Sequence, residues 1–193
     1  HLRRIAPDIS NIVVMGMGEP LMNLDNLRAA VGIFCDEAGL GLSRRRITLS
    51  TSGIAAGIRD LAEPGPDVRL AVSLTTADPE LRSVLMPVTK SDPLPVLKEA
   101  LLYHRKLVDK RITLEAVLLG GLNTRVRDAD ALAGFAQGLD AVVNLIPWNP
   151  VDGLGIVGGR PLSEPSSAEV ERFARELERR GLQVTRRFRK GRG

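Results

Sequence analysis

Cysteine, histidine and aromatic residues are scarce in this chain of 193 residues. Its single cysteine, Cys35, excludes an internal disulfide. His1 and His104 are the only histidines, so the chain lacks the ligands for a cysteine and histidine metal site of its own. The aromatic fraction of 3% leaves few rings on which nucleic-acid bases could stack. These absences exclude a disulfide scaffold and a self-contained zinc domain.

Long apolar runs and a leader-like beginning are also absent. No apolar run approaches the roughly 20 residues that span a bilayer, so we expect no membrane partner. The opening segment has no apolar h-region of a signal peptide, and the cytoplasm is the expected compartment. With a hydrophobic fraction of 44%, residues 1–193 are expected to form one domain.

The charge is distributed unevenly along the chain. Lys and Arg number 27 against 23 Asp and Glu, which gives a net charge of +4. Residues 186–193 hold five basic groups and no acid, so the remainder carries about −1. A basic segment on a nearly neutral body predicts either a solvated terminus or a contact with RNA phosphates. The candidate RNA contacts are Arg186, Arg187, Arg189, Lys190 and Arg192.

Short apolar and β-branched segments alternate with helical patterns. Several of these segments are almost continuously apolar, which is typical of strands covered on both faces. Asp92 and Pro93 predict the start of one helix, and Ser166 with Glu169 forms a capping box that predicts another. The predicted strands are residues 11–16, 46–50, 68–74, 112–119, 141–146 and 182–188.

This alternation fixes the expected fold class as α/β. Strands that alternate with helices need crossover connections, which predicts mostly parallel strands with outer helices. Six strands fall short of the eight in a complete (βα) barrel, so the sequence predicts an open sheet or a partial barrel.

Glycines and polar side chains follow four of the predicted strands at their carboxyl ends, where parallel α/β proteins place their sites. These segments are residues 16–20, residues 50–53, residues 73–76 and the stretch that contains Asn149. Each segment alone is commonly a tight turn or a helix cap. Together they predict a ligand site at one edge of the sheet.

Three further residues carry chemistry, each with a plainer alternative. Cys35 and His104 have core spacing on their helices, which predicts an inert thiol and a structural imidazole. Glu115 lies inside the fourth strand, where a carboxylate that points into a barrel needs a partner or a role. No Ser-His-Asp order, P-loop or GxGxxG motif supports a hydrolase, an NTPase or a Rossmann fold.

In order and spacing, six segments resemble those of the radical-SAM adenine C2 methyltransferases of large-subunit ribosomal RNA, the RlmN/Cfr group. They are NIVVMGMGEPLMNLDNL, RITLSTSG, LAVSL with ADPELRSVLMPV, ITLEAVLLGGLN, VNLIPWNPVDG and VTRRFRKGRG. The resemblance covers nearly the whole chain from about Asn11. It implies a partial (βα) barrel of the radical-SAM type, whose first strand is missing here.

The resemblance also implies an activity, cofactors and partners. The enzyme would methylate C2 of an adenine in ribosomal RNA, with tRNA as a second candidate substrate. It would use S-adenosylmethionine, a 4Fe-4S cluster and an electron donor. The residues implied to bind S-adenosylmethionine stand at strand tips: Gly18 and Glu19 at the methionyl amine, Ser50 near the methionyl or ribose part, Ser73, Leu74 and Thr75 on the ribose and carboxylate side, and Asn149 at the nucleoside.

Two cysteine elements of the family have no counterpart here. The family binds its cluster through a CxxxCxxC loop and carries a methyl group on a cysteine near its C-terminus, and Cys35 matches neither position. The chain is expected to begin after the loop and to stop before the carrier cysteine. One thiol cannot replace three, so we expect no catalytic or metal-binding residue in this chain, and no activity of the chain alone.

Two alternative functions stay open. A remnant without a cluster could bind RNA or a nucleoside through the basic segment. A radical-SAM paralogue could act on another substrate, since Thr75 and Thr89 stand where the family commonly has His and Asn, and Gly120 lies where it has an acid.

Overall fold

The computed structural model describes residues 9–150, 153 and 155–187. Its main sheet contains six parallel strands in the same order as the chain, so each new strand is added at the same edge. Every strand lies within one residue of its predicted range, which confirms the α/β class. The strands are β1 (Ile12–Val14), β2 (Ile47–Thr51), β3 (Arg69–Ser73), β4 (Ile112–Leu118), β5 (Ala141–Pro147) and β8 (Gln183–Arg186).

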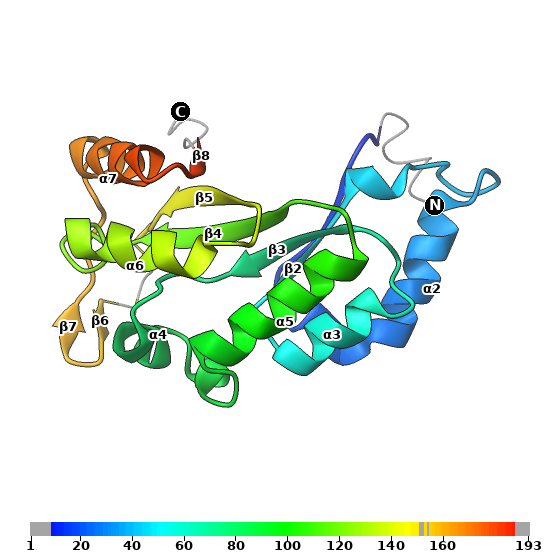
Figure 1. The fold of residues 1–193 in the computed structure, drawn as a ribbon, viewed down its shortest axis with the longest axis horizontal. Coiled ribbons are helices and arrows are strands. Elements are labelled where there is room, and N and C mark those ends of the chain that lie inside the picture. Colours follow the sequence, from blue (N-terminus) through cyan, green and yellow to red (C-terminus); the bar gives the residue numbers. More distant parts are fainter. Residues whose placement is uncertain (1–8, 151–152, 154, 188–193) are drawn as a thin grey trace.

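Helices connect the strands, as the crossover argument predicts. Because parallel crossovers are right-handed and all proceed toward the same edge, they place the helices on one face of the sheet. Helices α3 and α5 lie side by side along it (Figure 1). The helices are α2 (Leu24–Cys35), α3 (Ala55–Ala62), α4 (Pro79–Leu85), α5 (Leu94–Leu107), α6 (Val126–Ala136) and α7 (Ser167–Arg179).

Smaller elements occupy the connections. Three are single turns of 3-10 helix: η1 (Pro20–Asn23), η2 (Arg44–Arg46) and η3 (Pro87–Lys90). A short hairpin, β6 (Ile156–Val157) with β7 (Arg160–Pro161), precedes α7. Among the described residues, no helix is both long and apolar enough to cross a bilayer.

The core lies between the sheet and the helices. Leu49, Val72, Leu114 and Val143 come from four neighbouring strands, and none of them has exposed surface. Leu97 of α5 is buried to the same degree in the same cluster. Burying each such side chain contributes about 1.5–3 kcal/mol to folding stability. This packed core holds the strand tips in fixed positions.

The opposite face of the sheet is polar and partly open. The strand register aligns Ser73, Glu115, Asn144 and Thr185 in one row across four strands, which we name the inner polar row. Val13 lies on the same face of the sheet and is 52% exposed. The prediction that the strands are covered on both faces is therefore wrong for this face, which lines the inside of the partial barrel.

One predicted helix cap differs from the structure. Ser166 and Glu169 form the predicted capping box of α7. Asp92, in contrast, does not cap the helix that follows it, because Pro93 is the N-cap residue of α5. The Asp92 carboxylate instead accepts a hydrogen bond of 3.2 Å from the Ala55 N–H at the start of α3. Asp92 thus joins the beginnings of two neighbouring helices.

Candidate functional site

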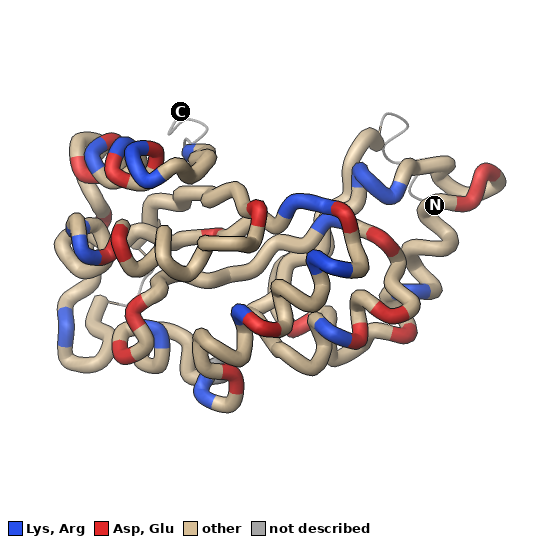
Figure 2. The backbone as a smooth tube through the Cα atoms, in the orientation of Figure 1, with Lys and Arg blue, Asp and Glu red and all other residues tan. Residues whose placement is uncertain are grey.

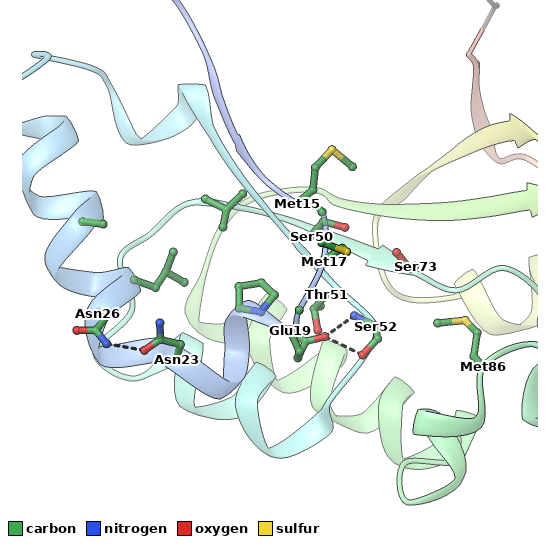
Figure 3. A pocket seen from close by; sticks show the side chains of 16 residues that line it. Met15, Met17, Glu19, Asn23, Asn26, Ser50, Thr51, Ser52, Ser73 and Met86 are labelled. Carbon is green, nitrogen blue, oxygen red and sulfur yellow. Dashed lines mark hydrogen bonds between the residues drawn. The ribbon is translucent and has the colours of Figure 1, made fainter. Parts of the chain in front are cut away.

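A groove of about 980 Å³ lies at the carboxyl ends of the first three strands (Figure 3). The end of β1 and the segment after it, residues 14–20, form one wall, and Ser50, Thr51 and Ser52 at the β2 tip form another. Ser73 at the end of β3 also lines it. Small-molecule sites typically measure about 300–1,000 Å³, so the groove can hold a cofactor-sized ligand.

The backbone after β1 is shaped by two glycines. Gly16 has φ +133° and Gly18 has φ +98°, a conformation that side-chain-bearing residues rarely adopt. No atom lies within 4 Å of where a Cβ would stand at either residue. A ligand can therefore approach the main chain closely on this wall of the groove.

Glu19 fastens the β1 tip to the β2 tip. Its Oε2 accepts hydrogen bonds from the Ser52 N–H at 2.8 Å and from the Ser52 hydroxyl at 2.7 Å. Its Oε1 accepts one from the Leu21 N–H at 3.1 Å, which caps η1. A carboxylate has about four acceptor positions, so one is left for a ligand.

Ser50 and Ser73 face the groove from neighbouring strands and share one carboxylate below it. The Ser50 hydroxyl donates to Glu115 Oε2 at 3.1 Å, and the Ser73 hydroxyl donates to the same oxygen at 3.3 Å. Glu115 is 9% exposed and belongs to the inner polar row. The partner that the sequence requires for Glu115 is thus a pair of serines.

Arg82 of α4 is a buried cation beside the groove. Its guanidinium donates to the Ser52 carbonyl at 3.0 Å, to the Ser73 carbonyl at 3.2 Å and to the Leu74 carbonyl. Burial lowers the pKa of Arg82 to about 10, so the group is charged at neutral pH. Sequence reasoning missed this residue, because periodicity does not reveal that a single arginine turns inward.

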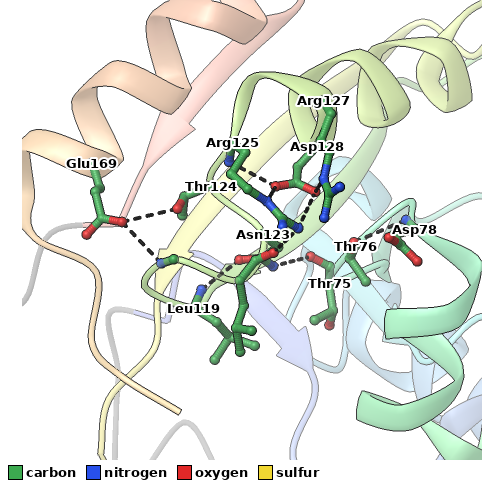
Figure 4. A network of polar contacts seen from close by, with 12 residues as sticks. Thr75, Thr76, Asp78, Leu119, Asn123, Thr124, Arg125, Arg127, Asp128 and Glu169 are labelled. Atoms are coloured by element: carbon green, nitrogen blue, oxygen red, sulfur yellow. Dashed lines mark hydrogen bonds and ion pairs between the residues drawn. The ribbon is translucent and has the colours of Figure 1, made fainter. Parts of the chain in front are cut away.

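The chain just beyond β3 adopts a tight conformation at Thr75, which has φ +60°. The Thr75 N–H donates to the Glu115 carbonyl at 2.9 Å, and its carbonyl accepts from the Asn123 side chain at 3.2 Å (Figure 4). Asn123 is 3% exposed and also binds the Val117 carbonyl and the Leu119 N–H. A left-handed β-branched residue costs about 1–3 kcal/mol, so these contacts hold the turn in place.

The structure brings together four of the seven predicted cofactor-binding residues. Gly18, Glu19, Ser50 and Ser73 line the same groove. The other three do not line the groove: Leu74 is fully buried, Thr75 follows it in the turn, and Asn149 is exposed beyond β5. The side chain of Thr89 lies outside the described part of the structure.

The candidate RNA contacts are only partly described. The Arg186 side chain pairs with Glu171 at 3.1 Å and with Glu178 at 3.0 Å, both on α7. Arg187 is exposed. Acidic and basic residues are interspersed along α7 (Figure 2). Arg189, Lys190 and Arg192 lie outside the described residues.

The donor set does not fit an iron–sulfur cluster. Within the described residues, no group of three His, Cys, Asp or Glu side chains could hold a metal ion. Cys35 ends α2 and packs partly buried against the core. Since helices that follow parallel strands run back toward the amino ends of those strands, Cys35 stands away from the groove. His104 is 2% exposed within α5.

Known proteins resemble this chain over nearly its whole length. The protein named "Probable dual-specificity RNA methyltransferase RlmN" of Treponema denticola is 48% identical over 191 residues, which are 99% of this chain and 53% of that protein. The protein of the same name from Thermus thermophilus is 42% identical over 184 residues, 95% of this chain and 50% of that protein. The chain thus spans about half the length of these relatives.

Solved structures agree with the sequence relatives. A radical SAM methyltransferase from Sphaerobacter thermophilus superposes with a TM-score of 0.88 at 37% identity, covering 98% of this chain and 54% of that one. A domain of a pyruvate-formate lyase-activating enzyme from Bacteroides vulgatus has a TM-score of 0.67 at 17% identity, which shows a shared fold; it covers 93% of this chain and 100% of that one. The model of the Radical SAM superfamily matches residues 1–132. The chain belongs to the Radical SAM superfamily.

Proposed function

We propose that this chain forms the S-adenosylmethionine-binding part of an enzyme that methylates C2 of an adenine in RNA. Large-subunit ribosomal RNA is the proposed substrate, and tRNA is a second one. The observation that carries the proposal is the groove, where Gly18, Glu19, Ser50 and Ser73 from three successive strands come together in a radical-SAM fold. The names of the relatives support an RNA substrate and, with it, a cytoplasmic location.

The groove residues suit the two ends of this cofactor. The open backbone at Gly18 gives main-chain polar groups access to the methionyl amine, and Glu19 keeps one acceptor position for it. Ser50 and Ser73 offer hydroxyl oxygens to the ribose or methionyl part. When bound, S-adenosylmethionine supplies the methyl group that is transferred. The residues of this chain bind and orient it and limit its contact with water.

Three predicted contacts depend on a ligand that reaches past the groove. Leu74 and Thr75 are proposed to face the ribose and carboxylate side through their backbone, because the Leu74 side chain is buried. Asn149 is proposed to contact the nucleoside from the end of β5.

For the RNA contact, Arg186 is a weaker candidate than Arg187, since two glutamates already pair with Arg186.

The proposed cluster cannot be ligated by this chain. Its one cysteine, Cys35, is a single thiol where the family it resembles uses three. The thiolates, and the electron donor that serves the cluster, are therefore proposed to come from outside residues 1–193.

The test uses the complete gene product that contains this chain. Incubation with S-adenosylmethionine and either ribosomal RNA or tRNA, followed by nucleoside mass spectrometry, should yield 2-methyladenosine. Glu19→Gln should reduce the yield by at least about tenfold, because an ammonium then loses its charged partner. Asp140→Asn, at the opposite edge of the sheet, is the matched control and should retain the yield. A methylated base other than adenine would favour a paralogue, and RNA binding without any product would favour a remnant.

A further inference from the structure

Glu115 is a buried carboxylate that has no role in the proposed function as described so far. It lies in the middle of β4, and the register places it beside Ser73 on one side and Asn144 on the other. Only 9% of the residue is exposed. A carboxylate at this depth is costly unless its oxygens accept hydrogen bonds. The structure therefore has to supply donors for it, and the donors that it supplies line the groove.

The two donors leave no choice about the direction of the hydrogen bonds. Each serine hydroxyl has one hydrogen and two acceptor lone pairs, whereas a carboxylate accepts hydrogen bonds and donates none. Ser50 at 3.1 Å and Ser73 at 3.3 Å must therefore both donate to Glu115 Oε2. Both hydroxyl hydrogens are committed to the interior of the partial barrel. What remains for the groove is the lone pairs of the two serine oxygens.

We propose that Glu115 is a positioning residue that makes Ser50 and Ser73 hydrogen-bond acceptors toward the groove. The ligand group that they select is then a donor of the hydroxyl or ammonium class, and an anionic oxygen is disfavoured. The inference rests on the proposed function, because S-adenosylmethionine carries donors of both kinds, two ribose hydroxyls and an ammonium group. Neither serine then donates a hydrogen bond to the carboxylate of that cofactor.

The charge around the groove agrees with this selection. Within the described part of the chain, neither Glu19 nor Glu115 forms an ion pair with a basic side chain. Arg82, the buried cation nearby, donates to main-chain carbonyls. Two carboxylates without basic partners favour a ligand that brings positive charge or hydrogen-bond donors.

A double-mutant cycle on cofactor affinity tests the proposal. In the complete gene product, isothermal titration with S-adenosylmethionine should show that Glu115→Gln weakens binding on the order of tenfold, because an amide can donate to one serine and release its hydrogen toward the groove. In the background Ser50→Ala with Ser73→Ala, the same substitution should change the affinity by less than about twofold. An equal loss in both backgrounds would overturn the proposal, since a purely structural role predicts that result.

Cofactor analogues identify the donor that is recognised. One analogue lacks the ammonium group, and another lacks both ribose hydroxyls. The effect of Glu115→Gln should vanish with the analogue that has lost the recognised donor. A full effect that persists with both analogues contradicts the proposal.

Two controls separate this inference from folding and from the proposed function. Asp140→Asn should change the melting temperature and leave the affinity unchanged. If Glu115→Gln does not fold, Ser50→Ala with Ser73→Ala, which keeps Glu115, should lose affinity for S-adenosylmethionine and none for the analogue without the donor. If the unmodified protein does not bind the cofactor, the proposed function is contradicted. If it binds without coupling between Glu115 and the serines, only the inference fails.

Discussion

The buried positive charge of Arg82 holds together two of the strand tips that form the groove. Arg82 is 3% exposed, and its guanidinium donates to main-chain carbonyl groups at the β2 and β3 tips and forms no ion pair with a carboxylate among the described residues. Carbonyl oxygens carry partial negative charge, so several of them replace part of the hydration that the guanidinium loses. The same bonds hold Ser52, just after β2, and Ser73, the last residue of β3, in place. A neutral side chain of similar size would fill the space without holding these tips.

Protonation of His104 should make the stability of the folded protein depend on pH. Burial, with smaller contributions from Arg105 and Lys110, lowers the pKa of His104 to about 4, and Asp67 opposes the shift. In the unfolded chain the pKa is about 6.5, so the unfolded state binds a proton first as the pH falls. The contribution of this group to stability is complete above pH 6.5 and is lost toward pH 4, by about 3 kcal/mol in total.

Urea denaturation between pH 7.5 and 4 measures this loss. His104→Leu should flatten the curve by about 3 kcal/mol over that range, because leucine fills the buried position without titrating. Both proteins share all other titrating groups, so the difference between the two curves isolates His104. Parallel curves for the two proteins would show that His104 is not the group responsible.

At the scale of elements, the close approach of α3 to η1 supports a prediction about two glycines. A Cβ added to Gly57 of α3 would stand 2.7 Å from the Leu21 Cβ, which is fixed to the backbone of η1. Gly57→Ala should therefore destabilise the protein by about 1–3 kcal/mol despite the better helix propensity of alanine. Gly32 of α2 has no atom within 4 Å of its Cβ position, and Gly32→Ala should stabilise by about 0.5–1 kcal/mol.

The two substitutions are chemically identical, so their opposite signs test packing alone. Thermal unfolding followed by circular dichroism measures both. Gly57→Ala should also weaken S-adenosylmethionine binding, because η1 follows directly after Glu19. An increase in stability for both variants would contradict the close packing of α3 against η1.

Elements whose signals are local could be predicted from the sequence, and those that depend on distant partners could not. The strands and the Ser166–Glu169 capping box are written in neighbouring residues, so their positions agree with the structure. The side chain of Asp92 binds a helix that starts 37 residues earlier, and nothing local reveals this choice. The conformation of Thr75 likewise depends on Asn123, which follows 48 residues later.

The candidate site follows the same division. Gly18, Glu19, Ser50 and Ser73 stand at strand tips, and parallel topology alone brings such tips to one edge. Glu115 could be suspected from its strand position, but its serine partners depend on the register of three strands. The half-open inner face was not expected, because an apolar strand sequence does not say which side receives the helices.

The whole molecule separates its charges by region, and this leads to a prediction about RNA. The body of the chain is nearly neutral, and many of the basic side chains described in the structure form ion pairs with acids, as Arg179 does with Glu176 on α7. Arg186 belongs to this balanced set. The exposed Arg187, together with Arg189, Lys190 and Arg192 outside the described residues, is the group expected to neutralise phosphates.

Salt dependence distinguishes phosphate contacts from a solvated terminus. Changing Arg187, Arg189, Lys190 and Arg192 together to glutamine in the complete gene product should reduce the slope of log affinity against log salt concentration by up to about 3 for a single-stranded ribosomal RNA fragment, since each phosphate contact contributes about 0.7. Arg45→Gln with Arg69→Gln is the control, because both residues are exposed at the amino ends of β2 and β3. This control should leave the slope nearly unchanged, because the proposed site lies at the other edge.

Filter binding between about 50 and 300 mM salt measures the slopes of both variants, since phosphate contacts weaken over this range of salt concentration. Equal slopes for the fourfold variant and the unmodified protein would mean that the basic segment is a solvated terminus, and that RNA is held elsewhere.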